Sequence, residues 1–397
     1  MAEREAKVGN SIINFMGYEC RGFAGNSILH YMKISDLTSF LQSVAPLSLQ
    51  EEYDNAGLLL GDPNWECTGA LCTLDVTEEV VEESVIKKCN CIVAHHPLIF
   101  RGLKKITGSN QVEKAVIAAI KQDVAVYAAH TNLDNVISGV NGKIADKVGL
   151  ANRKVIDSKF SVLQKLYTFV PAADLEKVRD ALFAAGAGNI SQYSECSFIH
   201  PGTGTFKPGT GTDPFSGTIG VRQNENEIKL EVILPNYKRN AVLQALFRSH
   251  PYEEVAYDLV NLANDFAGTG AGIIGDIEPT GEEEFLTFLH RNFNKGTIRH
   301  SSFTGKKIKR VAICGGAGSF LISKALSLEA DAYITGDIKY HEFFGAEGRM
   351  LLCDIGHYES EQYTTDLFIE LLLQKFPTFA VLKSEVRTNP VHYFTGK

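Results

Sequence analysis

The sequence has no long apolar run and no C-x-x-C cysteine motif. No stretch approaches the roughly 18 apolar residues that cross a bilayer, and Met1 to Phe23 lack the continuous apolar centre of a signal peptide. The eight cysteines are scattered, several of them inside apolar runs, and no two have C-x-x-C spacing. These absences exclude a transmembrane or disulfide-stapled protein and predict reduced thiols in a cytoplasmic one.

The sequence also lacks an excess of positive charge. Its formal net charge is -8, whereas a general nucleic-acid surface normally shows clustered Lys and Arg. One basic cluster, Lys306, Lys307, Lys309 and Arg310, is either a local patch or, as such runs more often are, a solvated rim. No general nucleic-acid surface is therefore expected.

The chain has an ordinary globular composition, with 397 residues of which 44% are hydrophobic, so two or three domains are expected. Apolar strand-like runs such as "GALCTLDVT", "CIVAHHP" and "VAVYAAHTNLD" alternate with amphipathic helical patterns such as "QVEKAVIAAIKQ". The same rhythm returns in "IKRVAICGGAG" and "RMLLCDIGHYE". This alternation predicts an α/β fold with a mostly parallel sheet.

The stretch from 158 to 262 interrupts this rhythm. It makes two similar passes of strand, helix and strand, with Pro171 and Pro235 ending the first strand of each. Two such halves predict an inserted ferredoxin-like domain. The α/β core is then discontinuous, formed by 32–157 and 263–397.

Residues 1–31 have an irregular pattern and are expected to be an appended arm, to which no role is assigned, with Met32 as an alternative start. A helix is predicted to begin near Leu37, capped by Ser35 or Asp36.

A loop dense in Gly, Thr and Pro, residues 200–220, joins the two passes of the insert. Its backbone N–H groups would suit a phosphate, but it lacks the Gly-Lys-Ser/Thr ending of a P-loop. A surface loop at a subunit contact or at the entrance to a site is the alternative interpretation.

Nearly every apolar run of the core ends in histidine or carboxylate residues. In open α/β sheets ligands bind beyond the carboxyl ends of the strands, so these residues are expected at one edge. The candidates are Asp75, His95, His96, His130, Asn132, Asp134, Asp337, His341, Asp354, His357, Glu359 and Glu361. Pro97 is expected to turn the chain so that both rings of the His95–His96 doublet reach one cleft. His357 and Glu361 share a face if a helix follows Gly356.

Histidine nitrogen combined with carboxylate oxygen suits Zn²⁺, Mn²⁺, Fe²⁺ or Co²⁺. Taken singly, each of these residues is more often a core histidine or a helix surface pair than a ligand. Together they predict a metal site, because burying so many unpartnered ionisable groups is costly. The set exceeds what one tetrahedral ion needs and suits two neighbouring ions.

The stretches "DNAGLLLGDP", "AHHPLIF", "AAHTNLD", "ADAYITGDIKYH" and "DIGHYESE" occur in this order and resemble the Nif-three-like family. Its members are often labelled GTP cyclohydrolase 1 type 2 homologues. The similarity runs from Met32 to Lys397 and includes "GTGTFKPG" and "HPYEEVAYD" of the insert. It implies a dinuclear metal centre, an inserted PII/CutA-like domain in the longer members, and a homohexameric ring.

By motif, the resemblance assigns five metal ligands: His95, His96, Asp134, His357 and Glu361. Two divalent ions per chain are expected, zinc first, with iron, manganese or cobalt as alternatives. The two carboxylates leave a residual positive charge that favours a small anionic substrate, possibly a nucleotide. Metal-dependent hydrolysis is the predicted activity. The alternative is a non-enzymatic ring that senses, stores or delivers metal, or docks a partner protein.

Further residues are given weaker roles. Asp337 and His341 are predicted to transfer protons, although orienting the ligands is an equally good interpretation. Asp75 and Asn132 are weaker candidates for orienting ligands, and Asp54 and Asn55 have either a turn role or a site role.

Overall fold

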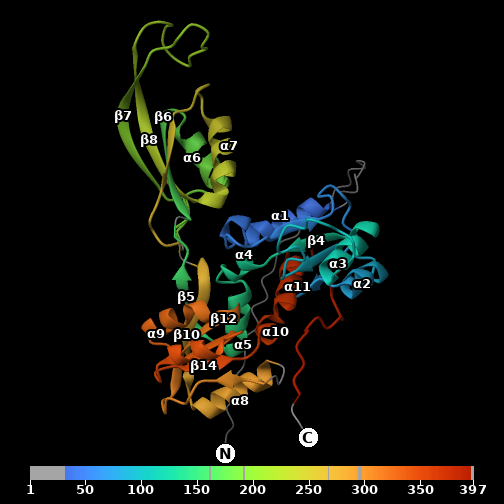
Figure 1. The fold of residues 1–397 in the computed structure, drawn as a ribbon. Helices are drawn as coiled ribbons and strands as arrows, with labels where there is room; N and C mark the ends of the chain where they lie inside the picture. Colours follow the sequence, from blue (N-terminus) through green and yellow to red (C-terminus); the bar gives the residue numbers. More distant parts are fainter. Residues whose placement is uncertain (1–31, 161, 191–192, 267, 294–296, 395–397) are drawn as a thin grey trace, which may run out of the picture. The chain divides into compact units, whose positions relative to one another are not determined.

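The computed structural model describes residues 32–160, 162–190, 193–266, 268–293 and 297–394. The predicted arm, residues 1–31, lies outside these ranges. The described strands form three sheets, two in the predicted core and one in the predicted insert (Figure 1).

The first core sheet is parallel except at one edge. Its order is β1 (Gly57–Leu60), β4 (Ala125–Ala128), β3 (Cys91–Ala94), β2 (Ala70–Thr73) and β15 (Val381–Lys383). Strand β1 runs antiparallel to β4, and the other pairings are parallel. The strands β2, β3 and β4 are the three apolar runs that precede Asp75, His95 and His130, so their carboxyl ends lie at one edge.

The second core sheet is mixed. Its order is β11 (Arg299–His300), β14 (Leu351–Asp354), β13 (Ala332–Gly336), β12 (Ile308–Ala317), β10 (Gly270–Thr280) and β5 (Ala151–Ser158). Only the β12-β13 and β13-β14 pairings are parallel. The core therefore contains two sheets rather than the one expected, and the parallel expectation holds for the first sheet and for the centre of the second.

The helices begin and end at the following residues: α1 Ile34–Val44, α2 Glu78–Ile86, α3 Gln111–Lys121, α4 Thr131–Asp134, α5 Val140–Val148, α6 Leu175–Ala184, α7 Arg239–Ser249, α8 Glu282–Asn292, α9 Ile322–Ser327, α10 His357–Glu361 and α11 Thr364–Lys375. Helix α1 begins before the predicted Leu37, because Asp36 acts at its third position. There the Asp36 carboxylate accepts the Lys33 backbone N–H at 2.8 Å, as in a capping box.

The amphipathic pattern of "QVEKAVIAAIKQ" forms helix α3 as predicted. The Asn110 side chain caps it by accepting the backbone N–H of Glu113 at 2.9 Å. Ala115, Val116 and Ala119 are buried at helical spacing. They pack with α2 and with one face of the first sheet, so this helix covers that sheet from outside the site.

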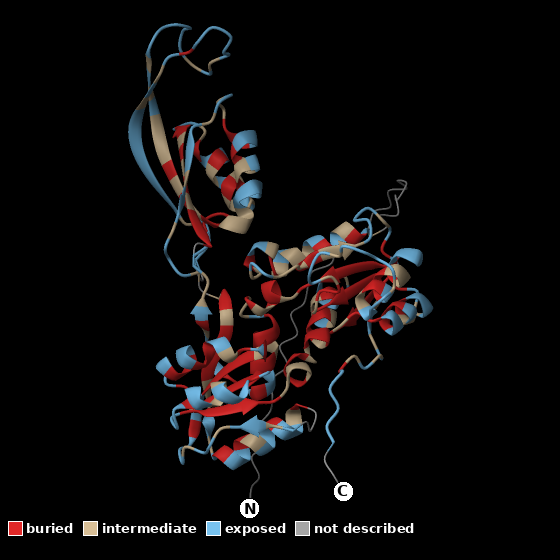
Figure 2. Ribbon diagram, viewed as in Figure 1, coloured by how far each residue is buried: buried red, intermediate tan, exposed pale blue. Residues whose placement is uncertain are grey.

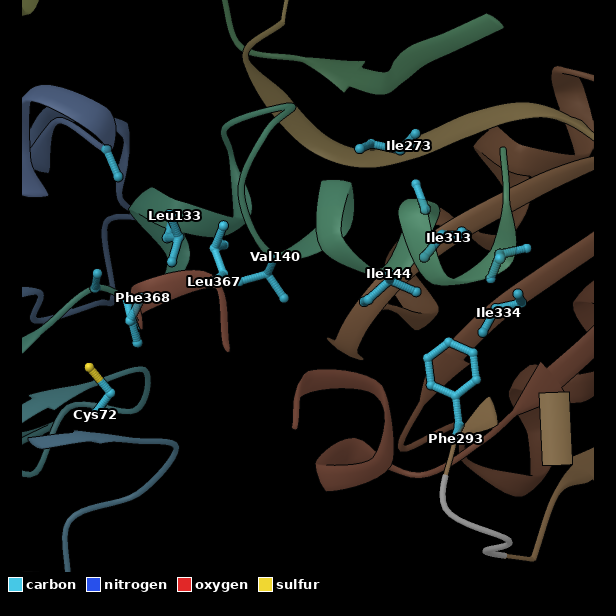
Figure 3. Close-up of a cluster of buried hydrophobic side chains, with 14 of the residues drawn as sticks. Cys72, Leu133, Val140, Ile144, Ile273, Phe293, Ile313, Ile334, Leu367 and Phe368 are labelled. Carbon is cyan, nitrogen blue, oxygen red and sulfur yellow. The ribbon is translucent and has the colours of Figure 1, made fainter. Parts of the chain in front are cut away.

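The two core sheets share one hydrophobic cluster. Cys72 of the first sheet and Ile313 and Ile334 of the second belong to it, with Val140 of α5 and Phe368 of α11 (Figure 3). These side chains are almost fully buried (Figure 2). Side chains on successive strand residues point to opposite faces, which allows a second cluster on the other face of each sheet. The shared cluster holds the two sheet edges at the site together.

The third sheet comes entirely from residues between 158 and 262. It is antiparallel, in the order β7 (Ser197–Phe206), β8 (Gln223–Pro235), β6 (Leu163–Pro171) and β9 (Tyr257–Asn261). Helices α6 and α7 lie along one face of it (Figure 1). Leu166, Leu230, Val178 and Val242 belong to one buried hydrophobic cluster between these helices and the sheet.

Two further observations concern the apolar character of the helices and the state of the cysteines. Within the described ranges, no helix combines the length and the apolar character that crossing a bilayer requires. The seven cysteines in those ranges are free thiols, and all but Cys196 are buried.

Candidate metal centre

The two core sheets bring their histidines and carboxylates to one place. His95 and His96 follow β3, and His130 follows the neighbouring β4. His357 and Glu361 are the first and last residues of α10, which follows β14 of the second sheet. The site is therefore built where the strand ends of one sheet face a short helix of the other.

The His95–His96 doublet contributes both rings to the site. Their ring centroids are 4.9 Å apart, and the ring of His130 lies 5.3 Å from His95 and 5.6 Å from His96. One ligand atom from each of these three residues lies within 4.8 Å of the others. Both adjacent rings therefore reach one group of possible ligand atoms.

Glu361 connects the two sheets at the site. Its Oε2 lies 3.0 Å from His96 Nε2 and 3.1 Å from His357 Nε2, and its Oε1 lies 3.6 Å from His95 Nε2. His96 Nε2 and His357 Nε2 are 3.3 Å apart. His96, His357 and Glu361 form a second group of atoms within 4.8 Å of one another, which shares His96 with the first group.

Each of the four imidazoles donates its Nδ1–H outward to an oxygen. The acceptors are the Ala129 carbonyl for His95 at 2.9 Å, Asp75 for His96 at 2.7 Å, Asp54 for His130 at 2.7 Å and Asp337 for His357 at 2.8 Å. This leaves Nε2 as the nitrogen available to a metal. Hydrogen bonding of the second ring nitrogen to carboxylate or carbonyl oxygen is the usual arrangement around metal-bound histidine.

The carboxylates of the site favour positive charge on the neighbouring histidines. Burial lowers the pKa of His95. Burial also acts to lower the pKa of His96, but hydrogen bonds to Asp75 and Glu361 outweigh it and raise this pKa to about 10. In the same way, Glu361 and Asp337 raise the pKa of His357 to about 9. In the metal-free protein, protons on two imidazoles thus neutralise the carboxylates.

The two carboxyl groups respond in opposite directions. Burial and the nearby charge of Glu361 raise the pKa of Asp134 well above its ordinary value. Burial acts in the same direction on Glu361, but the surrounding histidines outweigh it and lower the pKa of Glu361 well below its ordinary value. A cation bound beside Asp134 and Glu361 would allow both carboxylates to be charged.

Two buried polar atoms at the centre have no hydrogen-bond partner among the described residues. They are His95 Nε2 and Asp134 Oδ1, which lie 3.8 Å apart. Orphaned polar atoms in a protein interior are costly, and at 3.8 Å these two are too far apart to hydrogen-bond to each other. The chemistry of this donor set fits a divalent cation bound by nitrogen and oxygen.

One side of the site is open to solvent. The His95 side chain is 0% exposed and that of Glu361 is 4%, whereas His96 is 22% and His357 37% exposed. A small molecule can therefore approach from the side of His357. An accessible site of this kind differs from a closed structural zinc site.

The five predicted ligands are thus gathered together, but His130 was not among them. It lies two residues beyond the end of β4, just as His96 lies two residues beyond the end of the adjacent parallel strand β3. That shared position was the available signal. Asp134 belongs to neither group of mutually close ligand atoms, although its Oδ1 is near His95 Nε2.

Asp337 and His341, the predicted proton-transfer residues, are placed differently. Asp337 accepts the Nδ1–H of His357 and therefore orients a ligand. His341 is exposed and contacts the rings of Tyr340 and Phe344, rather than any of the five predicted ligands. Asp337 and His341 do not lie on one helix, because the 3₁₀ turn that contains His341 begins at Tyr340.

The weaker candidates fall into two groups, residues that orient a histidine and a residue that stabilises a turn. Asp75 and Asp54 each orient a histidine, so Asp54 has a site role. Asn132 accepts the His130 backbone N–H and donates to the Ala45 carbonyl, which makes it a residue of the turn. Thr388 was missed, because its hydroxyl reaches Asp75 at 2.7 Å from the far end of the chain.

Gly316 leaves the space that the Glu361 carboxylate occupies. Its φ is +61°, and a Cβ at this position would lie 2.3 Å from Glu361 Oε1. Gly316→Ala is therefore expected to displace Glu361 and to weaken metal binding at least about tenfold, as loss of ligand orientation does elsewhere. Metal content per chain after dialysis measures this effect.

Gly348→Ala is the matched control for this variant. Gly348 has a φ of +63°, but nothing lies within 4 Å of its added Cβ. In the control, alanine in the left-handed conformation lowers the free energy of unfolding by about 1 kcal/mol, and no ligand is displaced. This variant should therefore keep its metal. Wild-type metal content in Gly316→Ala would show that Glu361 is not held where the structure has it.

Comparison with known proteins agrees with this architecture. Residues 32–390 match the family described as Duf34/NIF3 (NGG1p interacting factor 3). A Halalkalibacterium halodurans protein named GTP cyclohydrolase 1 type 2 homolog is 39% identical over 369 residues, which cover 90% of this chain and 99% of that protein. A Bacillus subtilis protein of the same name is 35% identical over 363 residues, covering 89% and 96%.

A solved structure gives the same result for the fold. The crystal structure of a Bacillus cereus protein related to NIF3 superposes with a TM-score of 0.80 at 34% identity, covering 92% of this chain and 100% of that one. The family match spans both core segments and the stretch between them. The chain belongs to the DUF34/NIF3 family, as the resemblance in its sequence implied.

Proposed function

We propose that the site is a dinuclear metal centre, and that the protein is a metal-dependent hydrolase acting on a phosphate-containing small molecule. The observation that carries the metal proposal is the pair of orphaned atoms, His95 Nε2 and Asp134 Oδ1, beside the Glu361 carboxylate. The two overlapping ligand groups, which share His96, support two ions. The proposed ligands are His95, His96, Asp134, His357 and Glu361, with His130 as a sixth.

The charge balance supports an anionic substrate. Asp134 and Glu361 supply two negative charges against four positive charges from two divalent ions, and neutral imidazoles add none. The excess favours a phosphate group or another anion. When bound, such ions act as Lewis acids and lower the pKa of a bound water into the neutral range. Zinc is proposed first, with iron, manganese and cobalt as alternatives for this nitrogen and oxygen set.

The residues of the chain itself have two proposed tasks. Asp75, Asp54 and Asp337 hold the Nδ1 protons and so fix the orientation of three imidazoles. Asp337 is also 57% exposed on the open side of the site, where its carboxylate can accept a proton from an incoming group. His341, on the exposed turn that follows, stays a prediction for proton transfer.

The names of the relatives give the first substrate class. They include the words GTP cyclohydrolase, so a purine nucleotide heads the list of substrates for this chain. Exposed aromatic rings near the centre are compatible with a base: the Phe100 ring lies 6.2 Å from that of His130 and 6.3 Å from that of Tyr53.

We further propose the division of the chain and its assembly. Residues 32–157 and 263–397 form the metal-binding core, and 158–262 an inserted ferredoxin-like domain of PII/CutA type. The order β7-β8-β6-β9 with two helices on one face supports this, since it is what β-α-β-β-α-β connections produce. A homohexamer and a cytoplasmic location stay predictions, the latter supported by the free cysteines.

Hydrolysis of GTP and of simple phosphoesters by the metal-loaded protein tests the hydrolase proposal. His96→Ala removes the residue shared by both ligand groups and is expected to reduce turnover at least about 1000-fold, as loss of essential catalytic groups does. His341→Ala separates the proton-transfer prediction from metal binding, because it should retain metal. Equal turnover in wild type and His96→Ala would contradict the proposal.

Full metal loading without turnover of any substrate in the panel would instead favour the non-enzymatic alternative. In that case the ring would sense, store or deliver metal, or dock a partner.

A further inference from the structure

The two stretches of the insert that the proposed function leaves unused line a single cavity. It has a volume of about 430 Å³ and lies between the β7–β8 hairpin and the segment before β9. Gly204 and Phe206 of "GTGTFKPG" line one side, and Tyr252 and Glu253 of "HPYEEVAYD" the other. A cavity of this size accommodates a small organic molecule.

The walls combine aromatic rings with carboxylates. Phe206, Phe215 and Tyr252 line the cavity together with Glu227, Glu253 and Glu254. The rings of Phe215 and Tyr252 are 5.6 Å apart. Lysine and arginine do not occur among the described residues that line it. The negative charge of this lining argues against a phosphate held by the Gly-rich loop.

A hydrogen bond and a glycine hold the Glu227 carboxylate in the cavity wall. Tyr252 donates its hydroxyl to Glu227 Oε1 at 2.9 Å, which fixes that carboxylate against the wall. The other oxygen of Glu227 lies over Gly204, where an added Cβ would come within 2.1 Å of it. The absence of a side chain at Gly204 therefore makes room for the carboxylate.

The neighbouring histidine adds no positive charge. His250 is buried; it donates Nε2–H to the Phe169 carbonyl at 3.0 Å and accepts the Tyr252 backbone N–H at Nδ1 at 3.1 Å. Accepting at Nδ1 requires the neutral ring, and burial also lowers the pKa of His250. The same two bonds fix the turn that aims Tyr252 into the cavity.

The Gly-rich loop, residues 200–220, forms hydrogen bonds to the segment before β9 and to β8. The Asp213 backbone N–H donates to Glu253 Oε1 at 3.0 Å, and Ser216 donates to Glu225 Oε2 at 2.7 Å. The Gly-rich loop is thus fastened at both ends of its aromatic residue Phe215. The rings and the carboxylates face one space.

From these observations we propose that the cavity of the insert binds a small organic cation, with its ammonium group against Glu227 and among the rings of Phe215 and Tyr252. Aromatic faces and carboxylates together attract a desolvated ammonium group, in the manner of aromatic cages. The site is separate from the metal centre and does not depend on the proposed hydrolysis. It gives the insert a ligand-sensing role.

Calorimetric titration of the full-length protein with choline tests this site. The comparison ligand is 3,3-dimethylbutan-1-ol, which has the same shape without the charge. One choline per chain is expected, bound about tenfold more tightly than the neutral alcohol. Glu227→Gln keeps an acceptor for Tyr252 but removes the charge, and it should weaken choline binding about tenfold.

Glu231→Gln is the matched control, because Glu231 lies on the same strand but pairs with Lys229 and does not line the cavity. It should bind choline as the wild type does. Equal affinity for choline and the alcohol, or unchanged choline binding by Glu227→Gln, would overturn the proposal. Absence of choline binding would also overturn the proposal. This holds even if binding is absent because a second copy of the chain occupies the cavity. Tighter binding of inorganic phosphate would restore the phosphate interpretation of the loop.

Discussion

Glu361→Gln is expected to leave the protein folded but with well under half of its metal. Glu361 approaches three imidazoles, at 3.0, 3.1 and 3.6 Å, from the short helix α10. Substituting residues that merely orient ligands weakens metal binding by roughly 10- to 100-fold, so loss of a proposed ligand should exceed about 100-fold. Elemental analysis after dialysis against a weak chelator measures the retained metal.

Glu359→Gln provides the control for this experiment. Glu359 is also buried in α10, but it accepts a hydrogen bond from Asn389 rather than facing the histidines. Its substitution changes the same helix and the same charge while leaving the ligand set intact. The account is contradicted if both variants keep wild-type metal, or if both lose it to the same extent.

Removal of metal with EDTA is expected to lower the melting temperature by on the order of 10 °C. A ligand present at 1000 times its dissociation constant stabilises the folded state by about 4 kcal/mol, and each kcal/mol shifts the midpoint of a domain of this size by about 2–4 °C. The effect reaches the whole core because the ligands come from both sheets, which share one hydrophobic cluster. Differential scanning calorimetry with and without EDTA measures it.

The size of this EDTA effect should depend on pH. In the metal-free protein the pKa of His96 is raised to about 10 and that of His357 to about 9. A raised pKa in the folded state stabilises the metal-free fold fully below the ordinary histidine pKa of about 6.5, and this contribution falls as the pH rises from there until it is lost at about 9 and 10. Protons therefore replace the metal best in acid, and the loss of stability on adding EDTA should be larger at pH 8 than at pH 6.

An EDTA effect that is the same at both pH values would show that protons and metal do not compete for these imidazoles. A melting temperature unaffected by EDTA, in protein shown to contain metal beforehand, would show that the metal does not hold the two sheets together.

The site was largely predictable because strand ends are visible in the sequence. His95, His96 and His357 each follow an apolar run, and the carboxyl ends of parallel strands lie at one edge. His130 was a strand-end candidate but was not assigned as a ligand, and the hydrogen bond that it donates to Asp54, 76 residues earlier in the chain, could not be predicted. Thr388 is similarly 313 residues from the Asp75 that it contacts. Such distant partners leave no local pattern.

The split of the core into two sheets was also beyond local reasoning. The apolar runs of β3 and β13 have the same buried pattern, although they belong to different sheets. Periodicity indicates that a segment is a buried strand, but not which strand it pairs with. The antiparallel pairing of β10 with β5 and β12, on either side of it, makes the second sheet mixed.

The number of metal ions in freshly purified wild-type protein tests the central claim most directly. His96 belongs to two ligand groups, and the buried atoms His95 Nε2 and Asp134 Oδ1 have no hydrogen-bond partner within the described ranges. Elemental analysis of protein prepared without chelators is therefore expected to find about two divalent ions per chain, bound in a ratio that survives gel filtration. Fewer than about one ion per chain would contradict a dinuclear centre.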